Sequence, residues 1–191
     1  MNELGHAISR PPEALSYRQL QWLSGAAQQR APQRWQYWLH DQRSLTAQLR
    51  QLSGGQLTVE LLNQRVGLPN SSEQRQLQLA PRQWAMVREV ILCGGGQPWV
   101  FARTVVPLQT LSGPLRHLRQ LGSRPLGEAL FAQPTLLRSS FEIADCRRFT
   151  TSAGAHWGRR SRFTVLGRPL LVAEVFLDGF ARAAGLQRAA L

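Results

Sequence analysis

The sequence contains no lysine, only two cysteines and no apolar run near the length of a membrane span. A bilayer crossing needs about 20 consecutive, mainly apolar residues, so we expect none. The first residues also lack the cationic and then apolar order of a secretory signal. Cys93 and Cys146 are too far apart for a CxxC redox or zinc motif, and two cysteines cannot form the disulfide framework of a small secreted domain. We therefore expect free thiols and a cytoplasmic protein.

The positive charge is carried entirely by arginine. The chain has 23 arginines against 11 acidic residues, which gives a formal net charge of +12. Such a charge is typical of proteins that bind nucleic acid. The arginines are scattered as singles and pairs from Arg10 to Arg188, however, and form no stripe. We therefore expect no nucleic-acid partner, although the same charge would attract anionic small molecules.

Common patterns for metal binding and nucleophilic catalysis are missing. The four histidines show no metal-ligand spacing and no HExxH occurs. Ser112 lies in LSGP and not in GxSxG, and neither cysteine has a paired histidine in a local signature. The triple glycine at 94–96 lies between two predicted strands, which indicates a hairpin turn and not a phosphate-binding loop. We expect no metal and no cofactor.

Apolar spacing divides the chain into a helical first part and a strand-rich second part. Leucine and tryptophan recur at helix-like intervals between residues 15 and 52, which predicts two or three helices with breaks near Gly25 and Pro32 and a stop at 53–55. Residues 56–62 favour a strand, and the polar stretch 69–76 predicts a loop. The second part predicts strands over residues 84–93, 98–106, 135–144, 157–165 and 170–177. It also predicts two short helices, over residues 115–121 and 126–131.

These elements predict an α+β fold with a single antiparallel β-sheet, because the connections between strands are too short for parallel crossovers. We expect one domain over residues 1–191. Within it, residues 1–55 are mainly helical, residues 56–177 form the sheet, and residues 178–191 form an Ala-rich tail that could be helical. Residues 145–156 are predicted to form an exposed excursion between strands.

Three charged residues stand alone on apolar faces of predicted strands. Side chains alternate between the two faces of a strand. This alternation isolates Arg88 and Glu174, and it places Arg103 on one face with Trp99 and Phe101. Buried charges need partners. Either Arg88 and Glu174 neutralise each other inside the sheet, or they bind a ligand, and the pattern leaves both interpretations open.

Two further features concern anion binding. The helix that opens at Pro125 leaves the backbone N–H of Leu126 without an acceptor inside the helix, so it could donate to a carboxylate, although a plain surface helix start is commoner. The run at 157–162 is the densest basic patch. Arg160 and Arg162 would share one face of a strand while Arg159 lies opposite, which indicates a solvated sheet face.

Four ordered segments carry a resemblance to a known family: REVILCGGGQPWVFARTVVPLQTLSGP at 88–114, RPLGEALF at 124–131, WGRRSRF at 157–163 and GRPLLVAEVFL at 167–177. They resemble the chorismate pyruvate-lyases of bacterial ubiquinone biosynthesis. The helical first half matches only loosely, around Trp38 and residues 44–46.

The resemblance implies a chorismate lyase-like fold, in which helices cover a single antiparallel sheet as flaps and enclose the ligand. It also implies a cofactor-free carbon–oxygen lyase that eliminates pyruvate from chorismate and leaves 4-hydroxybenzoate. The family's ligand contacts correspond to Arg88, Leu126 and Glu174, and Leu45 stands where the family has methionine. We expect Arg88, with the N–H of Leu126, to hold the ring carboxylate and Glu174 to bind the hydroxyl. Arg103 is the candidate for the second carboxylate or for an exit route.

Two other functions compete with this interpretation. A related sheet fold serves as the effector-binding domain of bacterial transcription regulators, so a non-catalytic sensor of small aromatic acids is the alternative. Such a regulator would carry a winged helix-turn-helix domain, for which this sequence leaves no separate segment. A nucleic-acid-binding protein would show steep salt dependence and indifference to chorismate. We expect a monomer whose partner is the small molecule chorismate.

Overall fold

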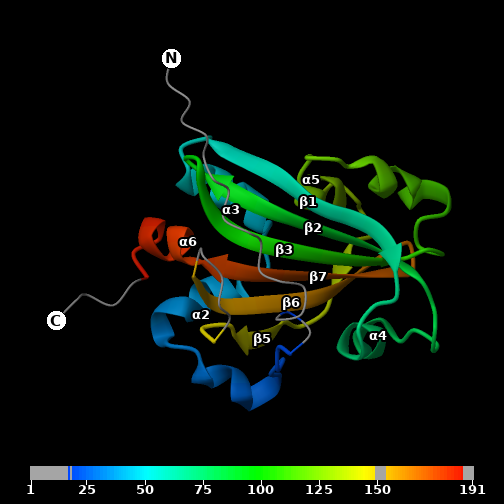
Figure 1. The fold of residues 1–191 in the computed structure, drawn as a ribbon, viewed down its shortest axis with the longest axis horizontal. Coiled ribbons are helices and arrows are strands. Elements are labelled where there is room, and N and C mark those ends of the chain that lie inside the picture. The colour runs from blue at the N-terminus through cyan, green and yellow to red at the C-terminus, as the bar shows by residue number, and fades with distance from the viewer. Residues whose placement is uncertain (1–16, 18, 149–153, 187–191) are drawn as a thin grey trace.

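The computed structural model describes residues 17, 19–148 and 154–186, and these residues contain one antiparallel sheet of seven strands (Figure 1). The strands run in the order β1-β2-β3-β7-β6-β4, and β5 pairs with β6. Their bounds are β1 (Leu57–Gly67), β2 (Ala85–Gly94), β3 (Gln97–Pro107), β4 (Leu137–Arg138), β5 (Glu142–Asp145), β6 (Ala155–Val165) and β7 (Arg168–Leu177). The predicted α+β class with a single antiparallel sheet is confirmed.

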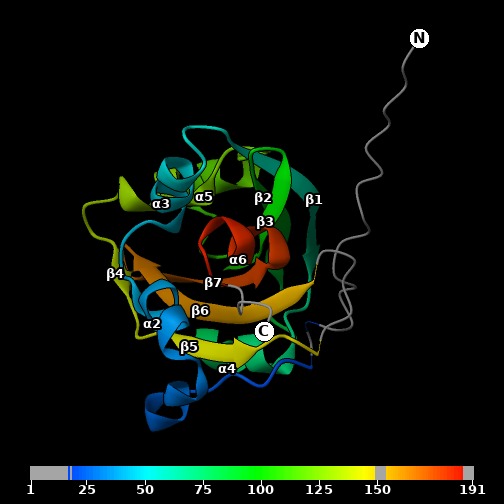
Figure 2. The same cartoon turned by 90° about the vertical axis from the view of Figure 1, so that its left-hand side faces the viewer.

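Helices lie on both faces of this curved sheet (Figure 2). The concave face carries α2, α3, α5 and α6, whereas α4 lies on the convex face. None of the helices in the described residues is long and apolar enough to cross a membrane. The helices are η1 (Gly25–Arg30), α2 (Gln33–His40), α3 (Leu45–Leu52), α4 (Ser71–Leu77), η2 (Gly113–Gln120), α5 (Leu126–Phe131) and α6 (Asp178–Ala183), where η marks a 3-10 helix.

Helix α4 replaces the loop that was predicted for residues 69–76, so that prediction is wrong. Asn70 caps the helix by accepting a hydrogen bond of 2.9 Å from the N–H of Glu73, and the Glu73 carboxylate accepts one of 2.9 Å from the N–H of Asn70. This reciprocal capping box starts a helix even in a polar segment. The Asn-x-x-Glu spacing was the sequence signal for it.

The hairpin between β2 and β3 forms as predicted, with one irregularity. Gly95 and Gly96 both have positive φ, which suits the two-residue turn of a hairpin. Leu92 pairs with Val100 but Cys93 pairs with Pro98, so β3 carries an extra residue. This bulge places Trp99 in the concave core with Val100, and not on the face of Phe101 as alternation predicted.

The remaining predicted elements differ mainly at their bounds. The single strand predicted over 135–144 is two short strands, β4 and β5, which both pair with β6. The start of the tail forms α6. The first predicted helical segment, before the break near Gly25, forms no helix over residues 19–24, where Leu23 instead forms an isolated bridge with Ile143. The middle of the 145–156 excursion and the tail after residue 186 lie outside the described residues. The division into one domain over residues 1–191 stays a prediction.

Two apolar clusters occupy the concave face and leave room between them. One is built on Trp35, Leu39, Phe176 and Phe180, where α2 and α6 pack on the sheet. The other joins η2 and α5 to the opposite end of the strands. The convex face has its own clusters. The central strands are therefore covered on both sides, and β2 is buried along its whole length.

Both cysteines are free thiols, as predicted, and both are buried. Burial raises the pKa of Cys93 to about 12 and moves the pKa of Cys146 in the same direction. Because the thiolate is the reacting species, both should react with a disulfide reagent at pH 8 far more slowly than free cysteine. Thiol titration before and after denaturation measures this. Rapid release from the native protein would contradict the burial.

Candidate active site

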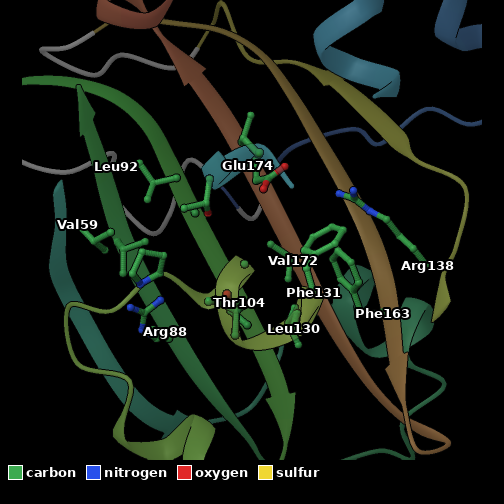
Figure 3. Close-up of a pocket in the computed structure, with 17 residues that line it drawn as sticks. Val59, Arg88, Leu92, Thr104, Leu130, Phe131, Arg138, Phe163, Val172 and Glu174 are labelled. Atoms are coloured by element: carbon green, nitrogen blue, oxygen red, sulfur yellow. The ribbon is translucent and has the colours of Figure 1, made fainter. Parts of the chain in front are cut away.

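A cavity lies on the concave face, between the sheet and the helices α3 and α5 (Figure 3), and the space between its walls, counted together with the part that is open to solvent, is about 540 Å³. Its lining is mainly apolar and includes Val59, Leu92, Leu130, Phe131, Phe163 and Val172. Three charged side chains interrupt it, which are Arg88, Arg138 and Glu174. This lining suits a flat apolar ring that carries a few polar groups.

Arg88 is a buried cation, and it forms no ion pair within the part of the chain that the structure describes. It is 2% exposed, and its Nη2 donates to the carbonyls of Gly122 at 2.7 Å and Arg124 at 3.0 Å. Its Nε finds no hydrogen-bond partner among those residues. Burial lowers the pKa of this guanidinium. A buried charge without a counter-ion is costly, so an anionic ligand at Arg88 would relieve that cost.

Glu174 pairs with Arg159 and not with Arg88. The Nε of Arg159 donates to Oε2 of Glu174 at 2.7 Å. Strand β3 separates the strands that carry Arg88 and Glu174, so the two side chains enter the cavity from different strands (Figure 3). The interpretation in which they neutralise each other inside the sheet is therefore corrected.

Arg159 fixes the position of the Glu174 carboxylate. It is 1% exposed, and its Nη1 donates to the carbonyls of Trp38 at 2.6 Å and Asp41 at 3.0 Å at the end of α2. Its guanidinium also lies 4.7 Å from the centre of the Phe141 ring. These contacts leave the Arg159 side chain little freedom. Its guanidinium therefore fixes the position of the Glu174 carboxylate.

The basic run at 157–162 is not a solvated face, so that interpretation is wrong. Arg159 lies under the concave core, and Arg160 on the convex face is also buried. The Nε of Arg160 donates to Glu142 at 2.6 Å, and its Nη1 donates to the hydroxyl of Ser72 at 2.7 Å. Helix α4 and the ring of Trp22 cover this face. The two arginines are therefore internal ion-pair partners.

Leu45 and Leu126 line the cavity from α3 and α5. Leu126 is the first residue of α5 after Pro125, so its N–H has no acceptor within the helix. The structure thus brings together four of the residues that the sequence analysis selected. These are Leu45, Arg88, Leu126 and Glu174.

Arg103 does not line the cavity, which corrects its assignment to a second carboxylate or an exit route. Its side chain points to the convex face, because its neighbours Ala102 and Thr104 face the cavity. There it binds two acids, with its Nε 2.7 Å from Oε1 of Glu73 and its Nη1 2.5 Å from Oε1 of Glu89. The charge of Arg103 is therefore balanced by acidic side chains of the protein itself.

Arg138 is a cavity residue that the sequence analysis missed. It extends from the short strand β4, and its Nε donates to the hydroxyl of Ser161 at 2.8 Å. Its guanidinium lies over the rings of Phe141 and Phe163, at 4.1 and 4.6 Å from their centres. A strand of two residues has no measurable periodicity, so no sequence pattern marked Arg138.

The helices α3 and α5 form the roof of the cavity and meet at Gly127. A methyl group at Gly127 would lie 2.7 Å from Oγ1 of Thr46 and 3.3 Å from Oγ of Ser44. Arg50 on α3 and Glu128 on α5 form an exposed ion pair across the same contact. Glycine is therefore required for this close approach.

Gly127→Ala should force the two roof helices apart. Overpacking of this kind costs about 1–3 kcal/mol, so we expect a lower urea midpoint and weaker ligand binding. Denaturant titration and calorimetry measure the two effects. Thr46→Ala in the same chain removes the clashing hydroxyl and should restore part of the stability. Full stability of the single variant would show that the helices do not need to meet here.

Comparisons with known proteins identify the family of the chain. The family description "Chorismate lyase" matches residues 17–184. A protein named "Probable chorismate pyruvate-lyase" from Marinobacter nauticus is 43% identical over 141 residues, which is 74% of this chain and 74% of that protein. A "Chorismate pyruvate-lyase" from Escherichia coli O1:K1 is 41% identical over 144 residues, covering 73% of this chain and 80% of that protein.

Among solved structures, the crystal structure of PhnF from Mycobacterium smegmatis is similar in fold. The TM-score is 0.52 at 12% identity, and the match covers 73% of this chain and 65% of that chain. At this identity the likeness concerns the fold alone. The family match spans most of the sequence and agrees with relatives at about 40% identity. The chain therefore belongs to the chorismate lyase family.

Proposed function

We propose that the protein is a chorismate pyruvate-lyase, which converts chorismate into 4-hydroxybenzoate and pyruvate. One observation beyond family membership carries the proposal. The apolar cavity has a buried guanidinium without an anion on one strand, Arg88, and a carboxylate on another, Glu174. The aromatic product has a carboxylate and a hydroxyl at opposite ends of a flat ring, which matches that arrangement of charges.

In the proposed complex, the ring carboxylate accepts hydrogen bonds from Arg88 and from the N–H of Leu126. The ring hydroxyl at the far end donates to Glu174, and Leu45 covers the ring. A charge-assisted hydrogen bond of this type contributes about 1.5–3 kcal/mol. The apolar walls exclude water, which strengthens each of these contacts.

The reaction requires little beyond positioning. The C3–O bond of chorismate breaks, C4 loses its hydrogen, and the ring becomes aromatic. The hydrogen goes to the enolpyruvyl fragment, which leaves as pyruvate, so no atom is gained or lost. Aromatisation drives the reaction, and positioning alone can lower a barrier by about 7–11 kcal/mol in favourable cases. The proposal therefore includes no metal or cofactor.

Two routes exist for the C4 hydrogen: direct transfer to the departing fragment, or transfer through Glu174. In both routes Arg159 has the same function, because it holds Oε2 of Glu174 at 2.7 Å. We propose Arg159 as a positioning residue for Glu174, and Arg88 and Glu174 as the residues that contact the substrate.

The decisive experiment mixes purified protein with chorismate in the presence of EDTA. Equal amounts of 4-hydroxybenzoate and pyruvate should form, measured by chromatography and by a lactate dehydrogenase assay. A thermal shift with 4-hydroxybenzoate tests the site separately, because a ligand that binds only the native state raises the melting temperature. A positive shift without turnover would favour the sensor alternative. Turnover without a shift would argue against 4-hydroxybenzoate remaining bound in the site after the reaction.

The cellular setting follows from the same proposal. We infer that the enzyme is a cytoplasmic monomer and that its 4-hydroxybenzoate enters ubiquinone biosynthesis. A single fold covers the chain in this proposal. Gel filtration at several protein concentrations tests the monomer, and ubiquinone levels in a strain that lacks the protein test the pathway.

A further inference from the structure

The charges around the cavity do not balance at the end where Glu174 lies. Glu174 is neutralised by Arg159, with 2.7 Å between Nε and Oε2. Arg138 is a second cation at this end and lines the same cavity. Its hydrogen bonds go to neutral oxygens, the hydroxyl of Ser161 at 2.8 Å and the carbonyl of Gln42 at 3.2 Å. Arg138 forms no ion pair with any residue that the structure describes.

Arg138 is half-buried in the lining of the cavity and packs against aromatic side chains. The guanidinium lies over two aromatic rings, 4.1 Å from the centre of Phe141 and 4.6 Å from that of Phe163. Burial lowers the pKa of this guanidinium to about 10. The negative charges of Glu174 and Asp41 oppose this shift, and the positive charge of Arg159 adds to it. Arg138 therefore remains cationic at neutral pH, but it would gain from an anion.

The strand register places the Arg138 guanidinium close to Glu174. Its partner Ser161 lies two residues from Arg159 on β6, and residues two apart face the same side. Arg159 is directly opposite Glu174 on β7. The guanidinium is thus about one such step, roughly 6.5 Å along the strand, from the Arg159–Glu174 pair. Figure 3 shows Arg138 extending from the side of the cavity, with its guanidinium toward this end.

The substrate has an anion to offer at this position. On chorismate the enolpyruvyl ether is on C3, beside the C4 hydroxyl that we assign to Glu174. With the ring carboxylate at Arg88, the second carboxylate of chorismate must lie near the Glu174 end, a few ångströms from the hydroxyl. We propose that Arg138 binds the enolpyruvyl carboxylate, and that this contact makes the site distinguish the substrate from the aromatic product. This inference rests on the proposed function.

The assignment has a chemical consequence. When the C3–O bond breaks, the carboxylate on Arg138 leaves with pyruvate, while the ring carboxylate remains on Arg88. The two products are therefore held by different arginines. Arg138 contributes to binding chorismate and to holding the enolpyruvyl group in a reactive orientation, but it contributes nothing to binding 4-hydroxybenzoate.

The test compares two ligands on one set of variants. Arg138→Gln should lower kcat/KM for chorismate about 10- to 100-fold, the usual effect of losing a charge-assisted contact. It should change the dissociation constant of 4-hydroxybenzoate less than about twofold. Arg138→Lys keeps the charge and should recover part of the activity. Arg162→Gln is the matched control, since it removes one arginine from β6 at a position that does not line the cavity, and it should leave kcat/KM unchanged.

A stable analogue separates this inference from the proposed function. The probe is 3-(1-carboxyvinyloxy)benzoate, which has both carboxylates and an aromatic ring that cannot eliminate pyruvate. Calorimetry should show weaker binding of this probe to Arg138→Gln than to the unmodified protein. If chorismate is turned over but Arg138→Gln binds the probe and reacts normally, Arg138 is not the receptor.

Two further outcomes have distinct meanings. If Arg138→Gln loses affinity for 4-hydroxybenzoate as strongly as for the probe, Arg138 only maintains the shape of the cavity through Gln42 and Ser161, and the inference fails. If the unmodified protein does not turn over chorismate but Arg138→Gln selectively weakens the probe, the proposed function fails and the carboxylate site stands.

Discussion

Arg88→Met lowers kcat/KM for chorismate by about 100- to 1,000-fold and weakens 4-hydroxybenzoate to a similar degree; this is the result we expect. Truncating one partner of a buried, hydrogen-bonded charge pair costs about 2–5 kcal/mol. In the free protein the same change removes a buried cation that has no counter-ion among the described residues. Apolar replacement of such a charge is often tolerated, so the fold should survive. Steady-state kinetics, calorimetry with 4-hydroxybenzoate and a melting curve measure the three quantities.

Glu174→Gln is the matched comparison at the other end of the cavity. Glutamine can still accept a hydrogen bond from the ring hydroxyl, but it cannot accept a proton. General-base catalysis contributes about 10²- to 10⁴-fold. A fall in kcat of that size, with product affinity retained, would indicate proton transfer through Glu174. A small change would indicate direct transfer to the departing fragment. The variant also leaves Arg159 without its acid, so Glu174→Gln with Arg159→Met controls for an unpaired buried cation.

Normal kinetics in both Arg88→Met and Glu174→Gln would remove the basis for this site. A loss of turnover that accompanies a collapsed melting curve would indicate a folding defect, and the kinetics would then be measured at a lower temperature, where the variant is native. Product affinity provides the independent measure, because it depends on the cavity and not on the chemical step.

Strand alternation identified Arg88 and Glu174 because β2 and β7 are regular where these residues lie. The same reasoning could not assign Arg103. Strand β2 is buried throughout and β3 almost throughout, so both faces of the central strands are buried. Alternation separates the two faces, but it does not tell which of them borders a cavity. That depends on which helices cover each face.

Arg159 was within reach of the sequence. Leu166 and Gly167 both have positive φ, as a two-residue hairpin turn requires, and Val165 pairs with Arg168. Counting back from this turn puts Arg159 opposite Glu174. The interpretation of residues 157–162 as a solvated sheet face failed because it considered the strand alone. By contrast, the family resemblance, and no periodicity, indicated Leu45 and Leu126. Their place over the cavity results from helix packing at Gly127.

The second large effect concerns the convex face, where Arg103 joins α4 to the sheet. Its guanidinium binds Glu73, whose side chain is fully buried, and Glu89 on the neighbouring strand. Arg103→Met leaves two buried carboxylates without their cation. Breaking a buried pair by removing one partner costs about 3–5 kcal/mol. For a chain of this size, 1 kcal/mol corresponds to about 2–4 °C, so the melting temperature should fall by roughly 6–20 °C.

The control variant for this prediction carries Arg103→Met together with Glu73→Gln and Glu89→Gln. Neutral amides cost less to bury than carboxylates, so the triple variant should recover much of the lost stability, although Glu73→Gln also weakens the charge at the start of α4. Because Arg103 faces away from the cavity, Arg103→Met should bind 4-hydroxybenzoate normally at a low temperature, where the variant is still native. A loss of product affinity under those conditions would mean that the convex ion pairs and the cavity are coupled through β3. Arg103 would then contribute to ligand binding. Retained affinity with a lower melting temperature would mean that the two faces of the sheet have separate functions. The ion pairs on the convex face would stabilise the fold, and the concave face would bind the anion.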